Sequence, residues 1–71
     1  MVYYEFEVAG PLSNELIIGW LSQWPFESFM ENGEHCVSAY LPAKDYDLSF
    51  QNEVSETLEK HGVTTIEIRM K

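Results

Sequence analysis

The sequence predicts one small α+β domain in which four antiparallel strands and two helices share a single core. Three observations support this. Runs of alternating apolar and polar residues occupy both ends and the middle of the chain, two runs with helical spacing separate them, and a turn-forming pair divides the middle run. A chain of 71 residues supplies enough apolar surface for one core only. We therefore treat residues 1–71 as a single domain with the element order βαββαβ.

The first two elements are a strand and an amphipathic helix. Residues 2–8 alternate between apolar and other side chains, which is typical of a strand with one buried face. Gly10 and Pro11 interrupt that strand, and Ser13 is a suitable N-cap for a helix that we expect to end at Pro25. Its apolar residues recur at helical spacing on one side: Leu16, Ile17, Trp20, Leu21 and Trp24.

A hairpin is predicted next. Residues 26–31 and 34–41 have strand character, and the pair Asn32-Gly33 between them favours the positive φ angles of a tight turn. Pro42 ends the second of these strands. If Phe26, Ser28 and Met30 face the helices, Phe29 emerges between two glutamates on the open face or edge of the sheet.

The last two elements are a second helix and a final strand. Asp45, Asp47 and Ser49 compete as the N-cap of a helix whose apolar residues lie four apart, and Gly62 is its natural stop. Residues 63–71 are rich in β-branched side chains. One face of this strand carries Ile66, Ile68 and Met70, and the other carries Thr65, Glu67 and Arg69.

Right-handed crossovers between these elements give a ferredoxin-like arrangement, a four-stranded antiparallel sheet with two helices on one face. The opposite face is then open. We expect it to be acidic with some aromatics, carrying Tyr3, Glu5, Glu7, Thr65, Glu67 and Arg69, with Cys36, Ser38 and Tyr40 or their neighbours.

Composition limits the partners. Four basic and twelve acidic residues give a formal charge of −8, which repels nucleic acids and anionic lipids and favours a basic protein. The first ten residues lack signal-peptide features, and no apolar run approaches the roughly 20 residues that cross a bilayer. With Cys36 as the single cysteine, a soluble, reducing cytoplasmic setting is expected.

No catalytic, cofactor-binding or metal-ligating residue is predicted in this chain. His35 and Cys36 are adjacent on a strand and therefore point to opposite faces, which argues against a shared metal ion. His61 is better explained as a helix C-terminal residue, and the pair Glu5 and Glu7 as a solvated polar face. Acylphosphatases share this topology but need an arginine in the first turn, where this chain has Gly10-Pro11. RNA-recognition modules need basic strands, which are missing here.

Several segments resemble the start of the ribosomal-protein methyltransferases of the PrmA type, which modify the large-subunit protein called L-eleven. The similar segments are Tyr3-Tyr4-Glu5-Phe6, the stretch from Trp24 to Gly33, and Val37-Ser38-Ala39-Tyr40-Leu41-Pro42. Pro25 stands where that family commonly has glycine. The resemblance implies an N-terminal domain that orients the ribosomal protein, with S-adenosylmethionine expected in a separate catalytic domain. The abrupt end on the last strand also leads us to expect part of a longer protein.

The resulting hypothesis is a substrate-recognition domain that binds a basic protein, and whether the chain takes part in an enzyme is left open. The expected contacts are Tyr3, Glu5, Glu7, Phe29, Glu31 and Tyr40. The main alternative is a free-standing protein-interaction or oligomerisation module that uses sheet faces or edge strands. A small-molecule sensor and an autonomous enzyme rank below it.

Overall fold

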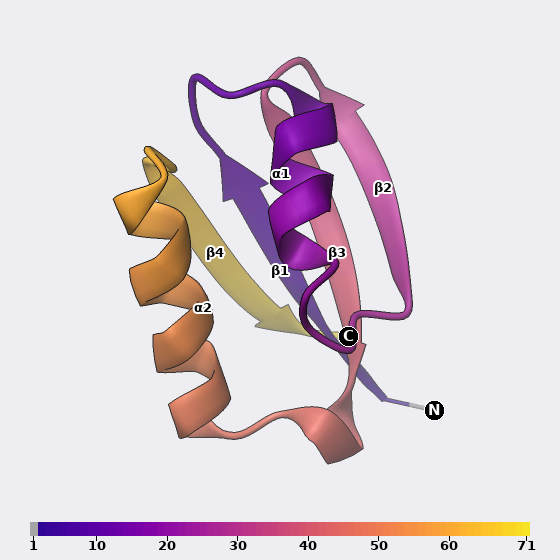
Figure 1. The fold of residues 1–71 in the computed structure, drawn as a ribbon. Coiled ribbons are helices and arrows are strands. Elements are labelled where there is room, and N and C mark those ends of the chain that lie inside the picture. The colour runs from indigo at the N-terminus through magenta and orange to yellow at the C-terminus, as the bar shows by residue number, and fades with distance from the viewer. Residues whose placement is uncertain (1) are drawn as a thin grey trace.

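The computed structural model describes residues 2–71, and it has the predicted α+β architecture. One antiparallel sheet runs in the order β2-β3-β1-β4, and both helices cover the same face of it (Figure 1). This is a ferredoxin-like arrangement, as the sequence predicts. The elements are β1 (Tyr3–Ala9), α1 (Asn14–Leu21), β2 (Ser28–Gly33), β3 (Cys36–Pro42), a short 3₁₀ turn (Ala43–Asp45), α2 (Leu48–Lys60) and β4 (Thr65–Met70).

The core lies between the sheet and the helices. In the two central strands the apolar residues that face the helices alternate with the residues of the open face, and β1 pairs with both β3 and β4. Burying one face of each strand fixes the register, because a one-residue slip would move every apolar side chain into water. The buried apolar residues are Phe6, Val8, Ile17, Leu21, Trp24, Val37, Ala39, Leu41, Val54, Leu58 and Val63.

Helix α1 begins as predicted and ends earlier than predicted. The Ser13 hydroxyl accepts a hydrogen bond from the Leu16 amide at 3.3 Å, which caps the first turn. The helix ends at Leu21, and the amide of Trp24 bonds back to the Leu21 carbonyl in a tighter turn. Pro25 explains this, because a proline disfavours helical geometry at the residue before it. Trp24 still reaches the core and is only 9% exposed.

The structure shows which of the three predicted N-cap residues begins helix α2. Asp47 is the N-cap, and its Oδ1 accepts a hydrogen bond from the Phe50 amide at 2.7 Å. The helix ends at Lys60, followed by His61 at the C-cap and Gly62 with φ +96°. The amide of Val63 then bonds to the Leu58 carbonyl at 3.0 Å, so Gly62 is the predicted stop.

The hairpin departs from the prediction in its turn. Gly33 pairs with Cys36, so the two-residue turn is Glu34 and His35 instead of Asn32-Gly33. The strand register shifts between Glu31 and Gly33, which places an extra residue, a β-bulge, in front of the turn. The Asn-Gly pair therefore lies in the bulge.

The orientation of Phe29 is also opposite to the prediction. Phe29 pairs with the buried Ala39, so it faces the helices, and its ring lies 6.2 Å from that of Phe26. Ser28 and Met30 face the open side. The reason is that Phe26 precedes the strand, so its inward position does not set the alternation within β2.

Candidate functional site

The open sheet face is organised in rows of side chains that run across the four strands. One row is Arg69, Glu5, Tyr40 and Ser28, and the next is Glu67, Glu7, Ser38 and Met30. The sequence predicted the members from β1, β3 and β4 correctly. Because neither helix covers this face, it is available to a partner (Figure 1).

Glu5 lies at the centre of the face and is only 8% exposed. Its carboxylate accepts hydrogen bonds from the Ser38 hydroxyl at 2.9 Å and the Tyr40 hydroxyl at 3.2 Å. It also pairs with Lys71 Nζ at 3.3 Å and Arg69 Nη1 at 3.5 Å. Burial alone would raise the pKa of Glu5, but the hydrogen bonds and the Lys71 charge outweigh burial, so the pKa lies below its ordinary value. Glu5 is thus charged, and its carboxylate joins side chains from three of the four strands.

Arg69 joins three carboxylates from two strands. Its Nη2 atom lies 2.8 Å from Glu7 Oε1 and 2.8 Å from Glu67 Oε2, while Nη1 reaches Glu5. Together with Lys71, this arginine balances most of the charge on the face. The open face is therefore less acidic than the sequence suggested, because Arg69 pairs with three of its carboxylates and Lys71 also reaches Glu5.

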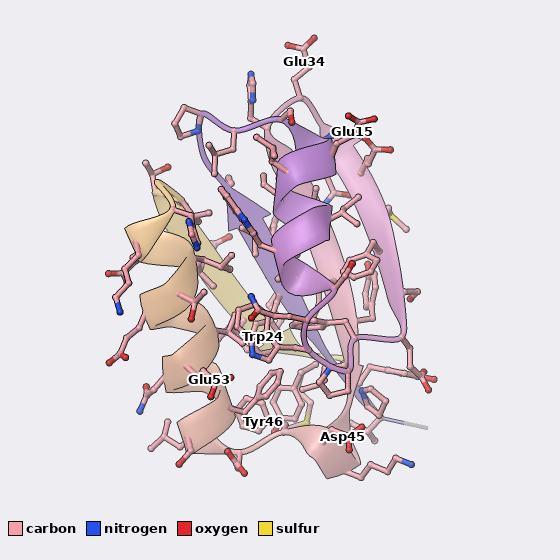
Figure 2. All side chains as sticks on the ribbon, viewed as in Figure 1. Glu15, Trp24, Glu34, Asp45, Tyr46 and Glu53 are labelled. Carbon is pink, nitrogen blue, oxygen red and sulfur yellow. The ribbon has the colours of Figure 1, made fainter. Side chains whose placement is uncertain are left out.

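The acidic surplus lies elsewhere on the surface. Glu15 at the start of α1 and Glu34 in the hairpin turn project at the same end of the molecule (Figure 2). Glu31 lies there too, and its Oε1 accepts a hydrogen bond from Asn14 Nδ2 at 2.9 Å. With Ser13 and His35, these residues line a shallow depression. We call this region the acidic end; within residues 2–71, none of its three carboxylates forms an ion pair.

Asn14 is a structural residue that the sequence reading missed. Its Nδ2 donates to the Gly33 carbonyl at 2.8 Å, and its Oδ1 accepts from the Cys36 amide at 3.0 Å. The side chain therefore ties the start of α1 to both sides of the β2–β3 turn. An asparagine beside a capping serine gives no sequence signal for a contact so far along the chain.

The predicted contact residues fall into two groups. Tyr3, Glu5, Glu7 and Tyr40 share the open face. Phe29 and Glu31 are on the other side of the sheet, where Phe29 packs against the core and Glu31 reaches the acidic end. The six residues therefore do not form one continuous surface.

A second depression lies at the corner of the open face near the start of β2. It is a shallow hollow of about 380 Å³ lined by Tyr3, Glu27, Ser28 and Tyr40. Both tyrosines were predicted as contacts. Ser28 was not, because the sequence predicted that it faces the helices, and Glu27 was placed beside Phe29 without being predicted as a contact. This hollow is open to solvent, unlike the enclosed clefts that bury most of the surface of a small molecule.

The cysteine and both histidines have contacts within the fold. Burial raises the pKa of the Cys36 thiol, and its hydrogen bond to Glu7 Oε2 at 3.6 Å raises it further. His35 donates from Nδ1 to the Leu12 carbonyl at 2.7 Å, and His61 stacks on Trp20 with ring centroids 4.2 Å apart. Both histidines thus have structural contacts. Within residues 2–71, no three histidine, cysteine, aspartate or glutamate side chains are grouped to hold a metal ion.

Neither helix in the described part of the chain is long and apolar enough to span a membrane. Comparisons with models of protein families, with curated proteins and with solved structures gave no match.

Proposed function

We propose that this chain is a substrate-recognition domain that binds a basic protein for an S-adenosylmethionine-dependent ribosomal protein methyltransferase in the cytoplasm. Two independent lines support the proposal. The first is the resemblance of its first strand, hairpin and third strand to the PrmA-type enzymes. The second is the way charge is distributed over the folded surface.

The charge distribution is the observation that carries the binding function. Arg69 and Lys71 are engaged by Glu5, Glu7 and Glu67 on the open face. The other nine acidic residues share the remaining surface with only Lys44 and Lys60. A surface with this excess attracts basic proteins, accelerates their encounter and makes their binding sensitive to salt.

The shape of the molecule is compatible with this role. The open face offers a broad, rigid surface whose central carboxylate is held by four neighbouring groups. The Glu27 corner lies at the margin of this face, and the acidic end lies at the hairpin end of the molecule beside the start of α1. Within residues 2–71 the carboxylates of both regions form no ion pair, so they supply unneutralised charge. Such a surface positions a protein without reacting with it. Methyl transfer and binding of the methyl donor belong, in this proposal, to a separate catalytic domain.

The binding proposal is tested by NMR titration of the isotopically labelled chain with purified ribosomal protein L-eleven at low and moderate salt. We expect localised shifts at the margins of the open face that weaken as salt rises. An unrelated basic protein of similar charge is the matched control. Equal shifts with both proteins, or no shifts with either, would contradict specific recognition.

The methyltransferase part of the proposal needs its own test. The isolated chain, added in excess to a PrmA-type enzyme methylating L-eleven, should compete for substrate and slow methyl transfer. Additional L-eleven should restore the rate. If the chain binds L-eleven but does not slow methylation at any ratio of chain to enzyme, binding of this substrate would be supported and the link to the methyltransferase would be contradicted.

An oligomerisation module is the second candidate, and the sheet edges favour it. Strands β2 and β4 are both edge strands, and each presents an exposed methionine, Met30 at 54% and Met70 at 65% exposure. Unpaired edges are templates for pairing with a second copy. Sedimentation equilibrium distinguishes the two functions, because a monomer across the accessible concentration range excludes this candidate.

A further inference from the structure

The hollow at the corner of the open face combines two aromatic rings with one carboxylate that has no ion-pair partner within residues 2–71. Tyr3 and Tyr40 are diagonal neighbours across the β1–β3 pair, because Tyr3 pairs with Pro42 and Tyr40 lies two residues before it. Ser28 pairs with Tyr40 on the far side. Glu27 precedes β2, and its amide bonds to the Tyr40 carbonyl at 2.8 Å, which fixes the backbone beside the rings.

Glu27 differs from the carboxylates at the centre of the face. Glu5, Glu7 and Glu67 are all paired with Arg69 or Lys71, whereas Glu27 forms no ion pair with any residue in 2–71. Its carboxylate is exposed, so its charge acts on whatever enters the hollow. The Tyr3 hydroxyl interacts with the Glu27 carboxylate. The pKa of Tyr3 is raised, first through its hydrogen-bonding interaction with Glu27 and then by burial, so the phenol stays neutral.

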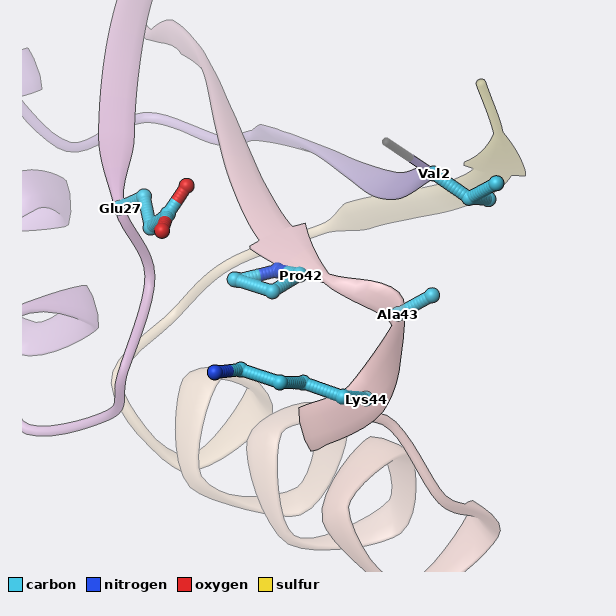
Figure 3. Close-up of a pocket in the computed structure, with 5 residues that line it drawn as sticks. All are labelled: Val2, Glu27, Pro42, Ala43 and Lys44. Carbon is cyan, nitrogen blue, oxygen red and sulfur yellow. The ribbon is translucent and has the colours of Figure 1, made fainter.

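Lys44 is a cation that borders the same glutamate. Glu27 also borders a neighbouring pocket with Val2, Pro42, Ala43 and Lys44. Figure 3 shows the Glu27 carboxylate and the Lys44 amine extending into this pocket from opposite sides. Lys44 is nevertheless exposed and unpaired with Glu27.

We propose that the Tyr3, Glu27, Ser28 and Tyr40 hollow holds a cationic side chain of the basic partner, with arginine preferred over lysine. This inference rests on the proposed function and deepens it, because it names the chemical group that the surface takes up. A neutral phenol face attracts a cation, and two faces beside a carboxylate supply both cation–π and ionic contacts. The hollow is open, which suits one side chain of a protein.

Arginine fits better than lysine for a geometric reason. Its planar guanidinium stacks on an aromatic face and presents paired donors to a carboxylate at its edge. The Ser28 hydroxyl adds an acceptor at the rim. An ammonium is more strongly hydrated and makes only point contacts, so it gains less from the same surroundings.

The test uses the whole chain and three capped tripeptides that differ only in the central residue, which is arginine, lysine or citrulline. Citrulline has nearly the shape of arginine without its charge. NMR titration should show saturable shifts of Tyr3, Glu27 and Tyr40 with the arginine peptide, weaker binding of the lysine peptide and no saturation with citrulline. Equal binding of citrulline and arginine, or shifts spread over all acidic residues, would overturn the proposal.

Substitutions in and around the hollow test which side chains contribute to binding of the arginine peptide. Glu27→Gln should weaken arginine binding roughly threefold, and Tyr3→Leu by a similar factor, whereas Tyr3→Phe keeps the ring and the affinity. Lys44→Ala should strengthen binding, because it removes the competing cation. Glu56→Gln makes the same change of charge on an exposed residue of α2 and should have no effect. Equal losses for Glu27→Gln and Glu56→Gln would show that only net charge matters.

The outcomes separate this inference from the proposed function. If L-eleven binds and Glu27→Gln has no effect, while Glu31→Gln weakens binding, the partner is recognised at the acidic end and the hollow is not its site. If the arginine peptide binds in the hollow but L-eleven does not bind at all, the cation site stands and the proposed function falls.

Discussion

Ser38 donates a hydrogen bond to Glu5 across the β1–β3 pair, with 2.9 Å between Oγ and Oε2. Ser38 is fully buried, and Asn32 Nδ2 donates to the same hydroxyl oxygen from the bulge of β2. The Ser38 hydroxyl therefore links Asn32 on the edge strand to the Glu5 carboxylate at the centre of the sheet through two consecutive hydrogen bonds. A buried carboxylate is stable in its charged form only when such donors replace water.

We expect Glu5 to make stability depend on pH. Its pKa is lower in the folded chain than in the unfolded chain, where glutamate titrates near about 4.3. Its contribution is therefore full above the unfolded value and is lost as pH falls through the folded value. Glu5→Gln should lower the free energy of unfolding by about 2 kcal/mol at neutral pH, and this difference should shrink as pH falls below the unfolded value and through the lower folded one. Urea unfolding of both proteins across pH measures it, and a constant difference would contradict the prediction.

Gly10 and Gly19 should respond oppositely to alanine. A Cβ at Gly10 would lie 3.1 Å from Val63 Cα, 3.2 Å from the Thr64 amide nitrogen and 3.3 Å from the Gly62 carbonyl oxygen. These are backbone atoms that cannot move aside, so Gly10→Ala should cost about 1–3 kcal/mol. A Cβ at Gly19, within α1, meets nothing within 4 Å, so Gly19→Ala should gain about 0.5–1 kcal/mol. Thermal unfolding measures both, and the same sign for both would contradict the assignment.

Phe29 and Met30 provide a test of the β2 orientation. Phe29 faces the helices beside Phe26, so Phe29→Ala should lower the free energy of unfolding by about 2 kcal/mol. Met30 is exposed on the open face, so Met30→Ala should change it by less than about 0.5 kcal/mol. The free energies of unfolding of the two variants, measured with denaturant, show which of the two residues faces the core. The reverse order would restore the orientation expected from the sequence.

The fold was predictable because each element has a strong local signal. The alternation in β1 predicts its open-face residues. The register that brings Tyr40 and Arg69 beside Glu5 was left open by the sequence and is given by the structure. Caps at Ser13 and Asp47 follow from side-chain chemistry that acts within one turn.

The candidate site was less predictable because it depends on contacts between distant residues. Which residues of β2 face the helices depends on where the strand begins, and the sequence around Phe26 does not show that it begins at Ser28. The Asn14 contacts to the hairpin likewise join residues far apart in sequence. The neutralised open face follows from the placement of Arg69 against Glu7, which net charge alone does not show.

Cys36 should react slowly in the folded chain. Burial raises the pKa of its thiol, and the hydrogen bond to Glu7 and the charge of that residue raise it further. Since the thiolate is the reactive form, alkylation near pH 8 should be slower in the native than in the urea-unfolded chain. Glu7→Gln should increase the native rate modestly, because burial remains. Native alkylation as fast as that of the unfolded chain would contradict this prediction.

His35 is strained, and its replacement should show how much the turn depends on backbone conformation. Its φ of 62° lies in the left-handed region, where glycine is at ease and β-branched residues are rare. His35→Gly and His35→Val both remove the hydrogen bond from Nδ1 to the Leu12 carbonyl, so that loss cancels between them. We therefore expect the valine variant to be less stable than the glycine variant by about 1–2 kcal/mol in urea unfolding. His35→Asn should fall between them, because asparagine tolerates this region, and a valine variant as stable as the glycine one would place the turn elsewhere.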